Sequence, residues 1–507
     1  MTNQRTKLAP NRRTFVTGTA AAASLLTTSA WARPIGANDE LRVAVVGLNG
    51  FGRRHILAYQ SIPGVRLVAL CDVDSTVLGR EATKLANKNI QVDKYVDIRQ
   101  LLDNPNIDAI SVVTPNHWHA LATIWACQAG KDVHVEKPIS HNLFESRQMV
   151  RAARKYNRIV QAGMETRSSP SLQLAAKYIQ QGELGSVLVA RAFVYKRRMS
   201  MGYVTQPQPV PTGVDYNLWC GPAKMTPLMR KEFHYDWHWQ WDYGNGVLGN
   251  NGAHMLDKVR YALGNPATLP TKVMSFGGRF GERDNGETPD TQVVMFELNS
   301  VPVIFESRAL GAKKDDPASD LYRAVGRNGL VMQFGEQSPR PKTGVMIQCE
   351  GGYVDLTPYG DCAAYDNDGK QIVSFKVAED GYEHDVNFIQ AVRSRNMGGL
   401  NGDIQEGHYS VALSHLGNIA YRVGRASTPE EIRESIQDND DALETLGRFE
   451  KHLQANQVDL RKAPPVLSPW LTIDADSERF HGPSAEEANR FISREYREPF
   501  VVSEETI

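Results

Sequence analysis

Residues 41–72 read as strand, glycine turn, helix, second strand and acid, an order that narrows the possible folds sharply. The apolar run Leu41–Val46 is typical of a buried parallel strand. Gly47 permits a sharp turn after it, and Gly52 permits the following helix to approach the strand closely. Asp72 ends the next apolar strand, where a carboxylate can accept hydrogen bonds from ribose hydroxyls. This order predicts a dinucleotide site with the pyrophosphate at the helix N-terminus.

Two details qualify the motif. Asn49 stands where the middle glycine of G-x-G-x-x-G is expected, and Gly50 follows it. A glycine pattern alone is weak evidence, since a turn between strand and helix arises without any nucleotide. Asp72 and Asp74 favour NAD, because they would repel the 2′-phosphate of NADP. NADP stays possible.

Residues 1–32 predict an export signal. They hold four basic and no acidic residues, followed by the mildly apolar stretch Phe15–Leu26 and the A-x-A sequence Ala30-Trp31-Ala32. Asn11-Arg12-Arg13-Thr14-Phe15-Val16 resembles a twin-arginine signal, which exports folded proteins. The alternative is a general secretion signal with an incidental arginine pair.

Export by the twin-arginine machinery predicts a periplasmic or extracellular protein. Little free nucleotide is present outside the cell, so we expect the dinucleotide to be tightly bound before export. Five scattered cysteines without a C-x-x-C pair suit folding in a reducing cytoplasm. A formal net charge of −1 argues against nucleic acid, and no later segment predicts stable insertion in a membrane.

The pattern of apolar segments predicts an α/β protein with two domains. Strands and helices alternate up to about Gly163, which predicts a doubly wound parallel Rossmann sheet. Alternating strand-like stretches joined by polar turns follow, which indicates an α+β domain with a large, mostly antiparallel sheet. We predict a signal at 1–32, the nucleotide domain at 38–163, the sheet domain at 164–459 and an extended strap at 460–507.

Polar residues at strand ends are the first candidate site, because ligands of open α/β sheets bind at the carboxyl ends of the strands. Lys137 follows one such strand, where its ammonium could orient a substrate and lower the pKa of an alcohol. Asn116 and His119 follow another strand and suggest contacts to the cofactor. Ordinary capping or core roles are the competing interpretation for each residue.

The second cluster is Asn250, His254 and Asp257, which would share one face of a helix. A histidine that titrates near neutrality can take the proton of a substrate hydroxyl as hydride leaves the carbon. Asp257 could fix the ring tautomer, and Asn250 could bind substrate. A hydrogen-bonded histidine without catalytic function is the alternative.

These motifs together resemble the Gfo/Idh/MocA family of glucose–fructose oxidoreductase and inositol dehydrogenase. The matching pieces are Gly47–His55, Asp72, Thr114-Pro115-Asn116 with His119, Glu136-Lys137-Pro138, and Gly249–Asp257 followed by Tyr261-Ala262-Leu263-Gly264. The resemblance implies a Rossmann domain with an open-faced sheet domain that often forms homo-oligomers. It also implies NAD(P)-dependent oxidation or reduction of sugars and cyclic polyols.

The resemblance assigns roles to single residues. Lys137 would be the catalytic lysine and His254 the acid/base. Asn250 departs from the aspartate of inositol dehydrogenase-like members, and an amide cannot relay a proton. The cofactor would contact Gly47, Asn49, Gly50, Phe51, Gly52, Asp72, Thr114, Asn116, His119, Glu136 and Lys137.

Aromatic residues suggest a carbohydrate. Trp237 and Trp239 belong to a segment with tryptophan at alternate positions, and indole faces stack on sugars. If this segment is a strand, the tryptophans equally suit a packed sheet face. Arg167, Tyr195 and Lys196 are further candidates by position. The histidines lack the spacing of a metal site, so no metal is predicted.

The leading hypothesis is an exported oxidoreductase that transfers hydride between NAD(P) and a sugar, polyol or glycoside. An alternative is a glycosidase that oxidises its substrate transiently, eliminates the glycosidic bond and returns the hydride. A third possibility is a sugar-binding protein without catalysis. Turnover without a net change in NADH would identify the glycosidase. Sugar binding without turnover would identify the binding protein.

Overall fold

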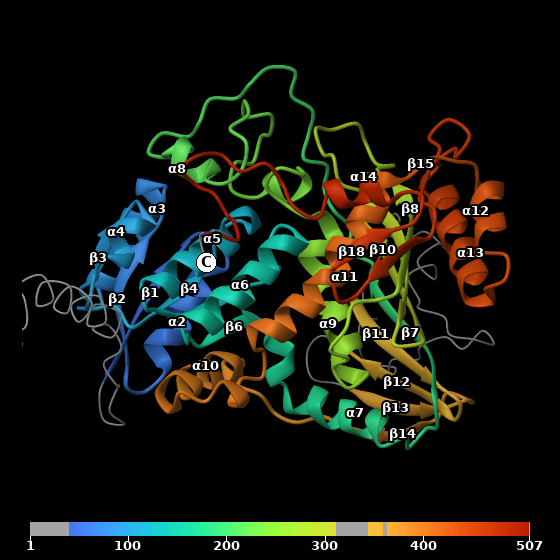
Figure 1. Cartoon of the computed structure of the whole chain (residues 1–507), viewed down its shortest axis with the longest axis horizontal. Coiled ribbons are helices and arrows are strands. Elements are labelled where there is room, and N and C mark those ends of the chain that lie inside the picture. Colours follow the sequence, from blue (N-terminus) through green and yellow to red (C-terminus); the bar gives the residue numbers. More distant parts are fainter. Residues whose placement is uncertain (1–39, 311–342, 358–361, 506–507) are drawn as a thin grey trace, which may run out of the picture.

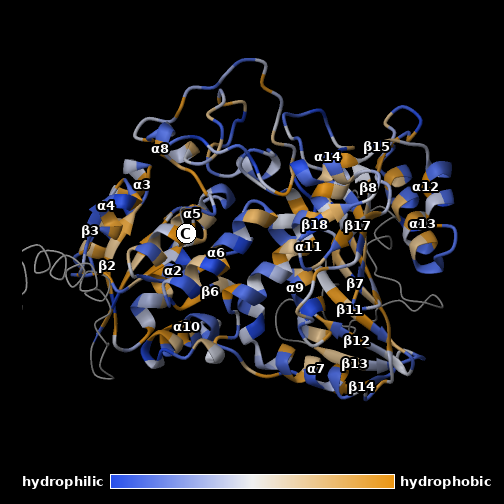
Figure 2. Cartoon of the chain, in the orientation of Figure 1, coloured by the Kyte–Doolittle hydropathy of each residue, from blue (hydrophilic) through white to orange (hydrophobic). Residues whose placement is uncertain are grey.

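The computed structural model describes residues 40–310, 343–357 and 362–505, so the predicted signal at 1–32 lies outside the described residues. Two sheets lie side by side, each with its own helices (Figure 1). Hydrophobic residues concentrate on the strands of both sheets (Figure 2). The α/β class predicted from the sequence is confirmed.

The first sheet is parallel, with the strand order β3-β2-β1-β4-β5-β6 of a Rossmann fold. Its strands are β1 (Leu41–Val46), β2 (Val65–Cys71), β3 (Asp93–Tyr95), β4 (Ala109–Val112), β5 (Asp132–Glu136) and β6 (Val160–Gly163). Its helices are α2 (Gly52–Ser61), α3 (Ser75–Ala86), α4 (Ile98–Leu102), α5 (Asn116–Gln128) and α6 (Leu143–Lys155).

The second sheet is mixed and mostly antiparallel; β10 and β7 form a parallel pair. Its strands are β7 (Val187–Val194), β8 (Lys272–Gly278), β9 (Thr291–Leu298), β10 (Val301–Arg308), β11 (Thr343–Cys349), β12 (Gly352–Leu356), β13 (Ala363–Asp366), β14 (Gln371–Ser374), β15 (Arg425–Ala426), β16 (Val466–Leu467), β17 (Leu471–Asp474) and β18 (Arg479–His481). Its longer helices are α7 (Pro170–Gln180), α9 (Ala253–Ala262), α11 (Ile404–Val423) and α13 (Asp440–Ala455).

Helices α9 and α11 cover the inner face of this sheet and join it to the Rossmann domain. Leu256 and Val259 of α9, with Leu416 of α11, are buried in one core with residues of β7–β11. The α11 helix also contacts α6 and β6 of the first domain. The α9 helix, which carries His254, is therefore held in a fixed position between the second sheet and α11.

The outer face is not fully open, which corrects part of the expectation from the resemblance. Helices α12 (Pro429–Ser435) and α13 cover β8–β10, where Leu446, Phe449 and Leu453 pack against Phe276 and its neighbours. These apolar side chains would otherwise be exposed to water. Homo-oligomer formation through this sheet stays a prediction.

The C-terminal half returns twice to the nucleotide domain. Phe388 and Val392 of α10 (Glu383–Ser394) are buried with residues of β1 and β2. The predicted strap from 460 contains β16–β18 and α14 (Ala485–Arg490), so it is less extended than expected. Phe500 and Val502 end it in the core around Trp118.

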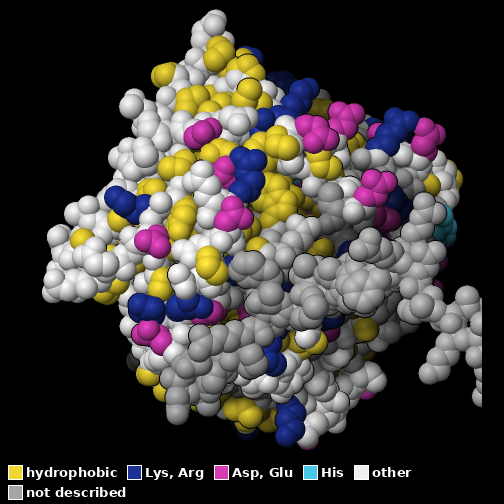
Figure 3. All heavy atoms as spheres, turned by 60° about the vertical axis from the view of Figure 1, so that its left-hand side comes forward, with side chains coloured by type: hydrophobic (Ala, Val, Ile, Leu, Met, Phe, Trp, Pro, Cys, Tyr) yellow, Lys and Arg dark blue, Asp and Glu magenta, His cyan; other side chains and the backbone are white. Residues whose placement is uncertain are grey.

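Among the described residues, no helix combines the length and apolar character needed to cross a membrane. All five cysteines are buried as free thiols. On the face shown in Figure 3, basic and acidic side chains are interspersed.

A buried ion cluster fixes α13 on the sheet. Glu306 of β10 accepts from Arg448 of α13 at 2.6 Å and from Arg308 at 2.7 Å. Burial alone would raise the pKa of Glu306, but Arg448, Arg308 and Arg191 outweigh it and hold that pKa at about 2. The carboxylate is therefore ionised wherever the protein is folded above this pH.

This cluster predicts how stability depends on pH. The pKa of Glu306 is lower in the folded chain than in the unfolded one, so its contribution is present above about pH 4.5 and is lost as pH falls towards 2. Glu306→Gln should lower the free energy of unfolding near pH 7 by about 3 kcal/mol. The loss should shrink below pH 4. Thermal unfolding across this range measures it, with the exposed Glu297→Gln as control; equal effects of both substitutions would contradict the account.

Candidate functional site

A cavity of about 830 Å³ lies at the carboxyl ends of β1, β2, β4 and β5, against residues of the second domain. Its volume falls in the range of small-molecule sites. Residues from the first domain form one wall, and residues 196–254 form the other. The strand-end location follows from the parallel sheet, because all its strands end at the same edge.

The glycine turn is built as its sequence predicts. Gly47 has a φ of +85°, and a Cβ there would lie 2.6 Å from the Val113 carbonyl oxygen. A Cβ on Gly52 would lie 2.1 Å from the carbonyl oxygen of Gly47. Only glycine permits this approach of α2 to the turn. The turn and the start of α2 line the cavity, so the positive end of the helix dipole faces it and suits a phosphate.

Three more of the residues that we predicted to contact the cofactor belong to this turn and line the cavity. Gly52 does not line it. Asn49, Gly50 and Phe51 are on the wall. Asn49 accepts a hydrogen bond from Arg80 at 3.2 Å. The side chain of Asn49 therefore lies beside the turn and leaves room for a ligand where a middle glycine is usual.

Asp72 both shapes the turn and faces the cavity. Its Oδ2 accepts from the N–H of Leu48 at 2.8 Å, and its Oδ1 accepts from the N–H of Asp74 at 2.9 Å. Burial raises the pKa of Asp72, and these two N–H groups oppose the rise. Each carboxylate oxygen keeps a second lone pair for a ribose hydroxyl.

Thr114, Asn116 and His119 lie along the next strand end and all line the cavity. The buried Thr114 hydroxyl has no hydrogen-bond partner in the described chain, as expected for a group that meets a bound molecule. Asn116 donates to the side-chain oxygen of Asn245 at 2.9 Å. The His119 ring nitrogens lie 2.6 Å from the carbonyl oxygens of Thr114 and Pro138, so this ring mainly holds two turns together.

Lys137 lies where the two domains meet. Its ammonium donates to the backbone oxygen of Asn250 at 3.0 Å and to the Asn250 side-chain oxygen at 3.2 Å. Burial lowers the pKa of Lys137, while Glu136 and Glu165 oppose this. The predicted substrate ligand Asn250 therefore also positions Lys137, from a π-helical turn at Leu248–Gly252.

His254 faces the same cavity from the start of α9. Burial, then the charge of Lys137, holds the pKa of His254 well below its ordinary value. Its Nδ1 has no hydrogen-bond partner among the described residues and lies 3.9 Å from Oε2 of Glu165. The imidazole is therefore neutral near pH 7 and able to accept a proton.

The residue beside His254 is Glu165, whereas the sequence analysis proposed Asp257. Asp257 is fully buried and forms an ion pair with Arg167, at 2.7 Å. Neither of these two residues lines the cavity, because α9 turns Asp257 away from the face of His254. Burial and the nearby Glu136 raise the pKa of Glu165 to about 7.

Glu165 escaped the sequence analysis although a signal existed. It follows β6, another strand of the parallel sheet that ends at the same edge, in a 3₁₀ turn (Glu165–Ser168). Applying the strand-end rule to that strand would have included it. The cavity residues Arg198, Tyr235 and His238 do not follow a strand of the parallel sheet, so the strand-end rule could not have found them. Asn251 lies next to Asn250 in the π-helical turn.

The tryptophan segment is a 3₁₀ turn (Asp236–Trp239) and not the strand considered from its alternation. Trp237 lines the cavity. Trp239 does not, and its ring contacts the Arg198 guanidinium, 5.3 Å from the ring centroid. Tyr195 also lies away from the cavity, where it donates to Glu306 at 3.1 Å. Lys196, the next residue, does line it.

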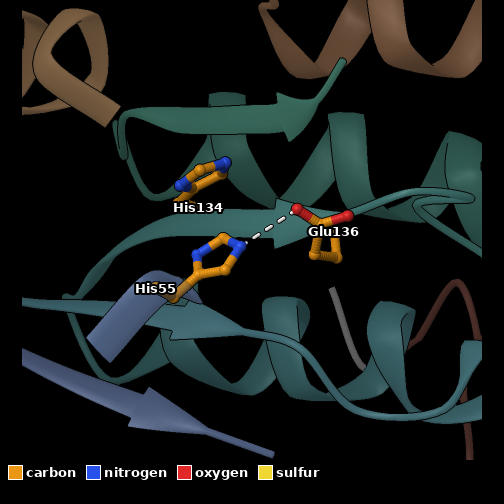
Figure 4. A group of neighbouring side chains, drawn as sticks. All are labelled: His55, His134 and Glu136. Atoms are coloured by element: carbon orange, nitrogen blue, oxygen red, sulfur yellow. Dashed lines mark hydrogen bonds and ion pairs between the residues drawn. The ribbon is translucent and has the colours of Figure 1, made fainter. Parts of the chain in front are cut away.

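Glu136 belongs to a cluster of buried polar side chains with His55 and His134 (Figure 4). His55 of α2 points towards Glu136, with 3.1 Å between its Nε2 and Oε1, and its Nδ1 lies 2.8 Å from the Ser111 hydroxyl. Burial raises the pKa of Glu136 to about 7. His134, on the same face of β5, completes a cluster of three possible metal ligands.

The cluster fits a hydrogen-bonded network better than a metal site. The possible ligand atoms lie within 4.8 Å of one another, but His55 and Glu136 already hydrogen-bond to each other, and His134 Nδ1 lies 3.0 Å from the Tyr59 hydroxyl. Both ring nitrogens of His55 already have partners.

Comparison with known families accounts for both domains. Residues 41–164 match the NAD-binding Rossmann fold of an oxidoreductase family, Gfo/Idh/MocA, and residues 174–278 match the C-terminal alpha/beta domain of that family. Both matched regions support a Gfo/Idh/MocA family oxidoreductase. The Rossmann match makes NAD the cofactor of the glycine turn. The free Thr114 hydroxyl and the position of Gly47 on the cavity wall fit that assignment.

The individual proteins that the chain resembles share about a quarter of its residues over the aligned regions. The chain is 26% identical over 313 residues to levoglucosan dehydrogenase of Pseudarthrobacter phenanthrenivorans, covering 58% of this chain and 70% of that protein. It is 27% identical to D-glucoside 3-dehydrogenase of Escherichia coli, covering 49% and 63%. A solved levoglucosan dehydrogenase with NADH and levoglucosan shares the fold, with a TM-score of 0.52 and 19% identity over 75% of this chain and 97% of that one.

The glycine turn of this oxidoreductase predicts a specific effect on NAD. Gly52→Ala places a Cβ 2.1 Å from a backbone oxygen, so the turn must shift away from the pyrophosphate. We expect the Kd for NAD, measured by calorimetry, to rise at least tenfold. Gly79→Ala in α3 is the control, because a Cβ there meets nothing within 4 Å. An unchanged Kd for Gly52→Ala would contradict the assigned position of the pyrophosphate.

Proposed function

We propose that this oxidoreductase transfers hydride between a tightly bound NAD and the carbinol carbon of a sugar, polyol or glycoside. One observation carries the proposal: Lys137 and a neutral His254 face one cavity at the strand ends, beside the dinucleotide turn. The named activities of the levoglucosan and glucoside dehydrogenases support a carbohydrate substrate.

In this proposal the substrate hydroxyl lies between Lys137 and His254. The Lys137 ammonium, held by Asn250, donates to the hydroxyl oxygen and stabilises its developing negative charge. The free His254 imidazole accepts the hydroxyl proton. NAD supplies the hydride acceptor when bound. Glu165 then stabilises the imidazolium, since its carboxylate lies 3.9 Å from the ring nitrogen.

We further propose export by the twin-arginine route to the periplasm or outside the cell. The support is the arginine pair in the basic 1–32 segment and its A-x-A sequence. Folding around NAD before export accounts for the tight binding that we propose. Fusion of residues 1–32 to a reporter that is active only after folded export tests the route. An Arg12→Lys, Arg13→Lys pair should block it, and unchanged export would contradict it.

The experiment for the activity starts from protein purified without added nucleotide. Denaturation should release about one NAD per chain, and a native sample should show reduced nicotinamide absorbance when the correct sugar is added. Sugar-dependent reduction supports the proposal. Cleavage of a glycoside with no net NADH would favour the glycosidase alternative. Sugar binding without either reaction would contradict catalysis.

Two substitutions separate catalysis from binding. Lys137→Met and His254→Asn should each lower kcat by at least a hundredfold, the usual effect of losing a general base or an electrostatic group. Bound NAD should remain within a factor of a few, because the glycine turn is untouched. Lys155→Met at the end of α6 is the matched control. Retained turnover in either variant would contradict the assigned roles.

The carboxyl beside His254 predicts the pH profile. Because the pKa of Glu165 is raised to about 7, its charge and hence kcat/KM for oxidation should rise with pH through about 7. Glu165→Gln should remove this ionisation. An unchanged profile in the variant would show that Glu165 does not act on His254.

A further inference from the structure

Two cationic side chains on the cavity wall have no role in hydride transfer. Lys196 and Arg198 follow β7, on a segment that enters the cavity from the second domain. They lie on the same wall as Asn251 and His254. The dinucleotide turn belongs to the other domain, so these cations belong to the substrate part of the cavity.

Arg198 is held by neutral groups alone. One nitrogen donates to the Tyr235 hydroxyl at 3.2 Å, and another donates to the side-chain oxygen of Asn251. The guanidinium also packs over Trp239. Its Nε is buried and has no hydrogen-bond partner among the described residues. The guanidinium is therefore fixed in place, and its charge is not neutralised by these contacts.

Lys196 is freer than Arg198, and its ammonium makes no hydrogen bond or ion pair within the parts of the chain that the structure describes. In those parts, neither cation has a carboxylate within ion-pair distance. Glu232 lies on the cavity wall but pairs with neither. The remaining wall carboxylates are Asp72, Asp97 and Glu136, which belong to the nucleotide domain.

Like charges therefore gather on one side of the cavity. Burial, then the charges of Arg198 and Lys137, lowers the pKa of Lys196. Burial lowers the pKa of Arg198 as well, with only Tyr235 opposing it. Holding several cations close together in a partly desolvated site is unfavourable unless an anion binds there and neutralises them. A solvated surface alone would account for Lys196 but not for the half-buried, immobilised Arg198.

We propose that the carbohydrate carries an anionic group, a carboxylate or a phosphate, which Lys196 and Arg198 bind while its carbinol meets Lys137 and His254. The planar guanidinium suits either oxyanion, and the mobile ammonium adds a point charge. This inference rests on the proposed function, because it assumes that the substrate occupies this cavity.

The test compares three probes that share a ring: D-glucose, D-glucuronate and D-glucose 6-phosphate. Their binding to the full chain with NADH is measured by the fluorescence of bound NADH, which needs no turnover. We expect at least one anion to bind at least tenfold more tightly than glucose, the size of a charge-assisted hydrogen bond. The preferred anion identifies carboxylate or phosphate, and its advantage should fall as ionic strength rises.

Substitutions locate the anion. Lys196→Gln and Arg198→Gln should each reduce the ratio of anion to glucose affinity about tenfold. Arg197→Gln is the matched control, since Arg197 is an exposed neighbour outside the cavity wall. If Arg198→Gln does not fold, the exposed Lys196 still decides, because its substitution removes no hydrogen bond or ion pair among the described residues.

The inference is overturned if neither anion binds, if glucose binds as tightly as both, or if the preference survives both substitutions. Failure of the proposed function is a separate result. It would appear as an anion preference that depends on Lys196, with no reduction of NAD by any carbohydrate. Reduction by neutral sugars with no anion preference would leave the function standing and refute this inference.

Discussion

The carboxyl edge of the parallel sheet is the constraint on which the rest of the site depends. Strands that run in one direction end at one edge, so Asp72, Glu136 and Glu165 are brought there together with Lys137. The second domain closes over this edge and removes water from the charges. Burial then shifts their pKa values, which gives a neutral histidine and two carboxyls poised near pH 7.

The second domain holds His254 in a fixed position relative to the nucleotide domain. The α9 helix that carries His254 is packed between the sheet and α11, and α11 contacts the Rossmann domain. Lys137 reaches across to Asn250 and so ties the two halves of the site. A displacement of one domain would break this contact, and catalytic geometry is sensitive to shifts of about 1 Å.

The fold and the main catalytic candidates were predictable from the sequence, because both follow from local patterns. Apolar runs and glycines give the Rossmann domain, and the strand-end rule gives Lys137. The carboxyl group beside His254 was missed because the strand-end rule was not applied to β6. Glu165 lies there, whereas Asp257 on the same helix as His254 pairs with Arg167. Trp239 and Tyr195 were predicted to bind substrate but do not line the cavity. Neither the alternation of tryptophans nor the place of a residue in the chain shows which way its side chain points. The helices over the outer sheet face carry no signal of their own that they pack there.

Transfer of deuterium tests the central claim most directly. A carbohydrate that reduces the bound NAD is labelled with deuterium at its carbinol carbon, and the nucleotide released after one turnover is analysed by mass spectrometry. The account predicts one deuterium on the reduced nicotinamide, because hydride passes directly from carbon to cofactor. A reduced nicotinamide that carries no deuterium would contradict it.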